Sequence, residues 1–130
     1  MSRDRIAIVE DAIALFNAGD ADGVVSCLAP SVCVYTEPQL TAGRAMEGRD
    51  AVRDWMATRR ARVPQLRMRL LDPVEYEGRL VADILVIAGP EGAGGGWRIS
   101  VAIWFEDDLI SALRLFWHRD SALEALEEQP

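Results

Sequence analysis

The spacing of the hydrophobic residues changes along this chain, and that change limits the folds open to it. Up to about residue 63 they recur mainly every three or four residues, as in helices with one buried face; the first run is Ile6, Val9, Ile13 and Phe16. Beyond Pro64 they form short runs separated by tight turns, as in a meander of strands. This order predicts an α+β domain in which a strongly curved antiparallel sheet wraps around helices on its concave side.

The expected elements follow from capping and turn signals. We expect helices at 5–18, 21–28 and 50–63, with Asp20 capping the second and Pro64 preventing continuation of the third. Strands are expected at 31–37, 66–76, 79–88, 97–106 and 109–118. The glycine-rich stretch 92–96 lies between two strands and lacks the Lys-Ser or Lys-Thr of a phosphate-binding loop. Residues 119–130 are expected to be a tail of a single domain, 1–130, that folds over the sheet or frays.

Charge and composition exclude several classes of partner. A formal net charge of -7 repels phosphate groups, so we expect neither nucleic acid nor an anionic membrane as a partner. No apolar run approaches the ~20 residues that span a bilayer, and the N-terminus lacks a signal-peptide core, so we expect a soluble, cytoplasmic protein. Cys27 and Cys33 lack metal-ligand spacing, and His118 is the only histidine. We therefore predict no metal site and no histidine-based triad.

Several segments together resemble one known superfamily. The segments are Phe16–Val25, Val34–Pro38, Ala51–Met56, Ile103–Glu106 and Ala112–Trp117. They resemble, in the same order, segments of the ketosteroid isomerase-like and SnoaL-like polyketide cyclase proteins of the nuclear transport factor 2-like superfamily. This resemblance covers roughly residues 5–117 and implies a cone-shaped domain with three N-terminal helices inside a curved sheet. It identifies the superfamily better than the activity, because one fold hosts many functions.

The resemblance implies a catalytic role for one carboxylate. Glu37 stands where the isomerases carry the base that moves a proton next to a carbonyl, and burial at the mouth of an apolar pocket would raise its proton affinity. The isomerases' oxyanion donors are missing, because their positions hold Ala12 and Val101, and Met56 replaces a supporting tyrosine. Such donors each supply on the order of 3 kcal/mol. We therefore do not expect a true ketosteroid isomerase.

A second carboxylate is expected to face the cavity. Asp83 shares a strand face with Val81, Leu85 and Ile87, and the resemblance places that face inward. A buried carboxylate needs a partner or a task, and Arg59 on the third helix is long enough to be that partner. Together with Glu37 they would suit cofactor-independent acid-base chemistry, including the opening of an epoxide. A slip of one residue in the strand alternation would instead turn Asp83 to the other face.

Strand alternation divides the aromatic residues between two faces. The inner face is expected to bind the substrate through Tyr35, Trp55, Trp97, Val101, Ile103, Leu113 and Trp117. Side chains of this kind equally form ordinary core. Trp104 and Phe116 should point outward, and an apolar outer face predicts a homodimer.

The sequence thus predicts a ketosteroid isomerase-like or polyketide cyclase-like enzyme that acts on a small apolar or polycyclic molecule without a cofactor. Two alternatives stay open at this point. One is a non-catalytic module of the same fold that binds a hydrophobic ligand or forms dimers. The other is an epoxide hydrolase, which requires Asp83 and Arg59 to converge on one water molecule.

Overall fold

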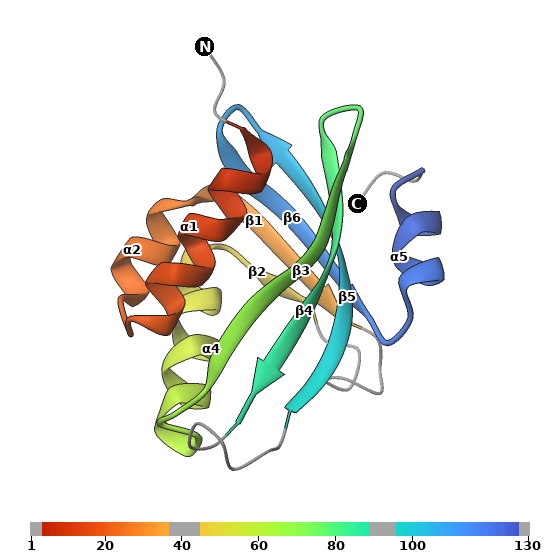
Figure 1. The fold of residues 1–130 in the computed structure, drawn as a ribbon. Helices are drawn as coiled ribbons and strands as arrows, with labels where there is room; N and C mark the ends of the chain where they lie inside the picture. Colours follow the sequence, from red (N-terminus) through yellow and green to blue (C-terminus); the bar gives the residue numbers. More distant parts are fainter. Residues whose placement is uncertain (1–3, 37–44, 89–95, 128–130) are drawn as a thin grey trace.

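The computed structural model describes residues 4–36, 45–88 and 96–127, and it has the predicted mixed α+β architecture. Figure 1 shows a curved sheet with helices α1, α2 and α4 on one side and the C-terminal helix α5 on the other. Their bounds are Arg5–Asn17 for α1, Ala21–Ser26 for α2, Arg49–Arg62 for α4 and Arg119–Ala125 for α5. The C-terminal segment predicted to fold over the sheet or fray therefore forms a short helix that packs on the sheet.

Side-chain caps fix where the first two helices begin. Asp4 accepts a hydrogen bond from the backbone N–H of Ile6 at 3.1 Å, at the start of α1. Asp20 does the same for Gly23 at 2.9 Å, which confirms the predicted cap of α2. Gly19, with a φ of 77°, supplies the left-handed turn between the two helices.

Six strands form one sheet in the order β2-β1-β6-β5-β4-β3. They span Leu28–Thr36 (β1), Met46–Glu47 (β2), Arg67–Tyr76 (β3), Arg79–Ile87 (β4), Gly96–Glu106 (β5) and Leu109–Phe116 (β6). Neighbouring strands pair antiparallel except β1 and β6, which pair parallel. The sheet is thus mixed rather than wholly antiparallel, because the connection through β2 and α4 between β1 and the meander lets the first strand join the last one in the same direction.

Two strand predictions were wrong near β1. The strand begins at Leu28, so Pro30 lies within it instead of preceding it. The register with β6 shifts between Leu28 and Cys33, and an irregularity of this kind tolerates a residue that cannot donate a ladder hydrogen bond. Met46 and Glu47, predicted as loop, pair with β1 as the short edge strand β2.

The sheet separates two hydrophobic clusters. The main core lies between the helices and the concave face, and it contains buried residues of α1, α2, α4, β1, β4, β5 and β6, with partly buried residues of β3 packed against it. The second cluster lies on the other face, where Ala122, Ala125 and Leu126 cover Trp104 and its neighbours. Both faces of the middle strands are therefore buried, which is unusual for a sheet expected to have one solvated face.

Candidate functional site

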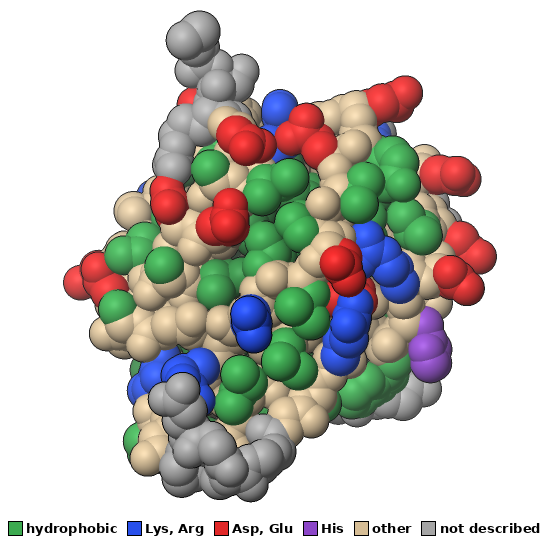
Figure 2. Space-filling view, viewed as in Figure 1, with side chains coloured by type: hydrophobic (Ala, Val, Ile, Leu, Met, Phe, Trp, Pro, Cys, Tyr) green, Lys and Arg blue, Asp and Glu red, His purple; other side chains and the backbone are tan. Residues whose placement is uncertain are grey.

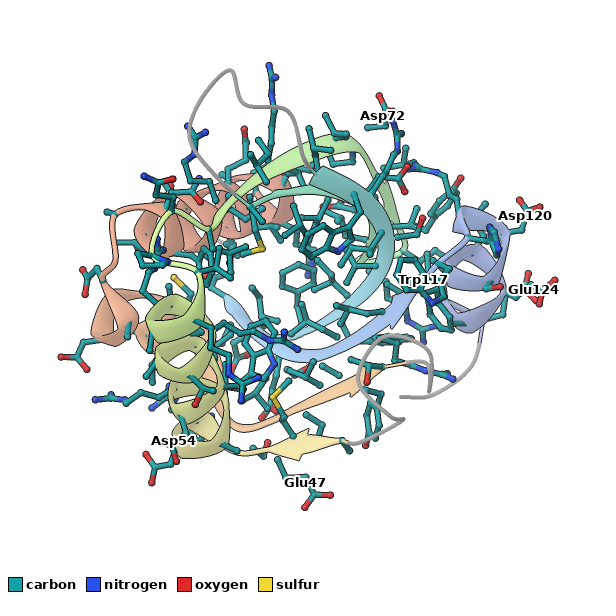
Figure 3. The ribbon with its side chains drawn as sticks, turned by 90° about the horizontal axis from the view of Figure 1, so that it is seen from below. Glu47, Asp54, Asp72, Trp117, Asp120 and Glu124 are labelled. Carbon is teal, nitrogen blue, oxygen red and sulfur yellow. The ribbon has the colours of Figure 1, made fainter. Side chains whose placement is uncertain are left out.

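The inner face of the sheet becomes more exposed toward one end. Along β5 the alternate residues on this face become more exposed toward the start of the strand: 0% at Ile103 and Val101, 6% at Ile99 and 46% at Trp97. Trp97 pairs with Val86, whose side chain is buried in the main core, so both belong to the same face. Figure 3 looks into this region from below and shows the strands curving around the interior. We call the part of the interior near Trp97 the open end.

The open end is apolar on several elements. Partly buried hydrophobic side chains pack against the main core from α4, β3 and β6; they include Trp55, Met68, Leu113 and Leu115. The guanidinium of Arg59 lies over the Trp55 ring, 5.5 Å from its centroid. The structure thus places Val101, Ile103 and Leu113 on the predicted inner face. Trp55 packs against the same core. The role of these four residues in binding stays a prediction.

The positions of the missing oxyanion donors lie within this core. Ala12 is 9% exposed, Met56 is 6% exposed and Val101 is fully buried. All three side chains are apolar and belong to the main core. An oxyanion formed in the interior would therefore find no hydrogen-bond donor at these three positions.

The predicted base, Glu37, lies outside the described residues. The residue before it, Thr36, is the last described residue of β1 and pairs with Leu115. Leu115 in turn pairs with Val101 of the inner face. Thr36 therefore lies beside β6, one strand away from β5.

Tyr35 was predicted to face the interior, and this prediction was wrong. Its neighbours Val32 and Val34 are buried in the main core, so alternation turns Tyr35 to the opposite face with Cys33. A hydrogen bond between Tyr35 and Cys33 and the nearby charge of Glu47 raise the pKa of the Tyr35 hydroxyl. The parallel pairing of Val34 with Leu113 fixes this assignment of faces.

Asp83 also lies on the opposite face from the one predicted. Its neighbours Ala82 and Ile84 belong to the main core, whereas Val81 belongs to the cluster under α5. Its side chain is 7% exposed, and its partners are Arg98 and Arg119, not Arg59. The convergence of Asp83 and Arg59 that an epoxide hydrolase would need is therefore absent.

Three donors share the carboxylate of Asp83. We call Asp83, these three donor residues and Asp72 the outer clasp. Arg98 Nε donates to Oδ2 at 2.5 Å, Ser100 Oγ donates to Oδ1 at 2.7 Å, and an Arg119 N–H donates to Oδ1 at 3.3 Å. The two arginines also reach Asp72, through its carboxylate at 3.0 Å and its backbone oxygen at 2.8 Å. Figure 2 shows blue and red side chains gathered where the sheet meets α5. The clasp ties the first residue of α5 to the sheet.

Sequence reasoning missed Arg98, Ser100 and Arg119 as partners of Asp83. Ser100 stands directly opposite Asp83 in the β4–β5 pairing, so the register would have revealed it. That register depends on the connection between Ile87 and Gly96, whose length in residues does not by itself fix the pairing. Arg119 comes from the helix that the sequence left as a tail.

The pKa of Asp83 predicts how the free energy of unfolding depends on pH. Burial raises the pKa, but the hydrogen bonds from Ser100 and Arg98 and the two arginine charges outweigh burial and hold the pKa below its usual value. A carboxylate with a lowered pKa in the folded state stabilises the fold above the unfolded pKa, about 3.9, and loses this effect as the pH falls through the folded pKa. We expect the difference in unfolding free energy between wild type and Asp83→Asn to be constant from pH 7 to 5 and to shrink below about pH 4. Urea denaturation across this range measures it, and a difference that grows toward low pH would contradict the account.

The outer aromatic residues have a different role from the one predicted. Trp104 faces outward as expected, but it is buried under α5 together with Ala122 and Ala125. The apolar outer face from which a homodimer was predicted is thus covered here by the chain's own helix, and the homodimer stays a prediction.

Trp117 was predicted to line the interior, which was wrong. The strand β6 ends at Phe116, so the alternation does not continue to Trp117. Figure 3 shows Trp117 beside α5, and its side chain is 38% exposed.

Other kinds of site find little support in the described part of the chain. Residues 4–36, 45–88 and 96–127 contain no group of three His, Cys, Asp or Glu side chains that could hold a metal ion. None of the helices described is both long enough and apolar enough to cross a membrane. The labelled carboxylates in Figure 3, Glu47, Asp54, Asp72, Asp120 and Glu124, all point away from the interior.

Solved structures share this architecture. An uncharacterised cystatin-fold protein from Novosphingobium aromaticivorans is 23% identical with a TM-score of 0.74, and the match covers 88% of this chain and 98% of that one. TerC, co-crystallised with polyporic acid, is 15% identical with a TM-score of 0.75, covering 95% and 98%. A protein provisionally named a polyketide cyclase, from Sinorhizobium meliloti, is 16% identical with a TM-score of 0.70, covering 87% and 99%. At these identities the likeness shows the fold alone.

Sequence comparison identifies the family directly. No curated protein sequence matches the chain. The model of the SnoaL-like domain, however, matches residues 9–113, which include most of α1 and most of β6. The chain belongs to the SnoaL-like domain family.

Proposed function

We propose that the chain binds one small, largely apolar molecule at the open end of its interior. The observation that carries the proposal is the graded exposure along the inner face of β5, which ends in Trp97 at 46% exposed. A tryptophan left this exposed beside a hydrophobic core offers a large flat contact area to a ligand. The partly buried side chains of Trp55, Met68 and Leu115 supply further apolar surface to the same core.

The character of the inner face supports a flat or polycyclic ligand. Every described inner-face residue of β4 and β5 is apolar; these are Leu80, Ala82, Ile84, Val86, Trp97, Ile99, Val101 and Ile103. Such a surface binds through burial of apolar area and offers little to a charged molecule. The fold shared with TerC, which was co-crystallised with polyporic acid, favours the same class of ligand.

The first test is a thermal-shift screen with steroids, aromatic polyketides and epoxides. A ligand that binds only the folded state raises the stability by RT ln(1 + [L]/Kd). We expect members of the first two sets to raise the melting temperature with saturation. A screen in which none of these compounds raises it would contradict the proposal.

The two most exposed tryptophans provide a matched pair of variants. Trp97 and Trp117 are 46% and 38% exposed, but only Trp97 lies on the inner face. We expect Trp97→Ala to weaken binding of a compound from the screen about tenfold or more, because it removes most of the aromatic contact. Trp117→Ala should leave the affinity unchanged. Calorimetric titration measures both, and an equal loss in the two variants would place the ligand elsewhere.

A second candidate function adds acid-base chemistry to this binding site. In it, Glu37 takes a proton from a carbon acid of the bound molecule and returns it, without a cofactor. The family, with its resemblance to polyketide cyclases, supports the same chemistry. The apolar residues at Ala12 and Val101 argue for a substrate that needs less oxyanion stabilisation than a ketosteroid.

A further inference from the structure

A second hollow lies away from the open end, at the other end of the sheet. It has a volume of about 400 Å³ and is lined by Arg5, Glu77, Gly78, Arg79, Trp104, Phe105 and Ser111. Its lining comes from the start of α1, the β3–β4 turn, the start of β4, the end of β5 and the start of β6, which lie toward the top of Figure 1. We call this hollow the arginine cleft.

Two residues of the lining each carry a buried hydrogen-bond donor without a partner. Nε of Arg5 and Nε1 of Trp104 are both buried, and no acceptor among the described residues reaches either one. Trp104 is only 5% exposed. A buried donor left unsatisfied costs about 1–3 kcal/mol, so two of them at one hollow call for an acceptor that the chain itself does not supply.

The remaining lining adds donors and positive charge. The Arg5 guanidinium is held over the Phe105 ring, 5.6 Å from its centroid, and Arg79 is held by a hydrogen bond that it donates to the backbone oxygen of Leu126. Ser111 contributes a hydroxyl, and Glu77 is the one carboxylate in the lining. Two guanidinium groups, an indole N–H and a hydroxyl present mostly donors, which suits a ligand made of acceptors.

The turn between β3 and β4 passes close to Arg5. Gly78 has a φ of 81°, a conformation that favours glycine, and a Cβ at this position would lie 3.6 Å from a terminal nitrogen of Arg5, an ordinary contact distance. The guanidinium donates its N–H groups in its own plane, so stacking on Phe105 orients these donors for a planar or tetrahedral oxyanion bound at the edge of the group.

We propose that the arginine cleft binds a small oxyanion, a carboxylate or a phosphate group, at a site separate from the apolar open end. Arg5 supplies the charge and Trp104 the buried N–H, while Arg79 and Ser111 complete the lining. The whole chain carries a net charge of -7, which disfavours non-specific binding of anions to its surface. Saturable binding of an anion would therefore have to come from a local site such as the arginine cleft.

The indole N–H of Trp104 allows a direct test by NMR. In a ¹H–¹⁵N spectrum the four tryptophans give four indole signals, and Trp104→Phe assigns the one of interest because it removes the N–H and keeps an aromatic ring. Sodium acetate and sodium phosphate are titrated separately at constant pH and ionic strength. We expect the Trp104 signal to move downfield and saturate with at least one of them, while the Trp97 and Trp117 signals stay in place. Saturation with acetate alone identifies a carboxylate site, and saturation with phosphate alone a phosphate site.

Matched arginine variants distinguish anion binding in the arginine cleft from an effect of the overall charge. Arg5→Gln should weaken the saturating anion about tenfold or more, because a charge-assisted hydrogen bond is lost. Arg62→Gln removes the same charge from the exposed end of α4 and should leave the affinity unchanged. The proposal is overturned if neither anion gives a saturating shift of Trp104, or if the two variants weaken binding equally. Should Arg5→Gln fail to fold, Ser111→Ala replaces it, with a smaller expected loss.

Discussion

Asp83→Asn is expected to lower the free energy of unfolding by about 2–3 kcal/mol at pH 7. The change removes the charge that Arg98, Ser100 and Arg119 share, on a side chain that is 7% exposed. Breaking a buried ion pair from one side leaves the partner groups without compensation, while the amide oxygen of Asn retains part of the hydrogen bonding. Urea denaturation of wild type and variant measures the difference.

Asp72→Asn is the matched control for this prediction. Asp72 shares Arg98 with Asp83, at 3.0 Å, but its side chain is 73% exposed. An exposed ion pair contributes little, so this variant should change the stability by less than about 1 kcal/mol. If the two variants lose the same stability, burial of the outer clasp is not what makes Asp83 important.

Glu37→Gln is expected to lower turnover of an identified substrate by about 100-fold or more, since a positioned general base contributes at least that factor. Gln has nearly the same size as Glu but cannot accept the proton, so binding of the same compound should be nearly unchanged. The measurement compares kcat with the dissociation constant for one substrate found by the ligand screen.

Glu47→Gln is the control for that experiment. Glu47 lies in β2 and points away from the interior in Figure 3, so its replacement should leave turnover intact. Unchanged turnover in Glu37→Gln would reject Glu37 as the base and leave the binding function alone. A loss shared by both variants would indicate an effect of charge rather than of a particular proton acceptor.

Local sequence signals were sufficient for most element bounds. The helix predicted at 5–18 is α1 at Arg5–Asn17, and the helix predicted at 50–63 is α4 at Arg49–Arg62. The turns at 77–78 and 107–108 were also placed correctly; Glu77 and Asp107 adopt φ values of 47° and 55° there. These features depend on capping, proline and turn chemistry, which act within a few residues.

The faces of β1 and β4 could not be assigned from the sequence. In β4 both Val81 and Ala82 are fully buried, one under α5 and the other in the main core, so hydrophobicity does not alternate. An apolar strand without alternation gives no indication of which side is inward. The face of Asp83 follows from the pairing of β4 with β5, and the face of Tyr35 follows from the parallel pairing of β1 with β6. Both pairings are contacts between separate segments of the sequence.

Contacts to the C-terminal helix could not be predicted from the sequence either. Arg119 reaches Asp83 and Asp72 across the sheet because α5 folds over β4, β5 and β6. The sequence left open whether this segment folds over the sheet or frays, because a helix of only seven residues is not stable without its tertiary contacts. The same docking explains why Trp104, predicted at a dimer interface, is buried within one chain.

The position of a bound ligand tests the central claim most directly. With a compound from the screen bound, intermolecular NOEs to assigned methyl groups show which surface it contacts. Binding at the open end predicts NOEs from the ligand to Met68, Ile99 and Leu115. NOEs only to Val81 and Ala112, on the opposite face of the sheet, would contradict it.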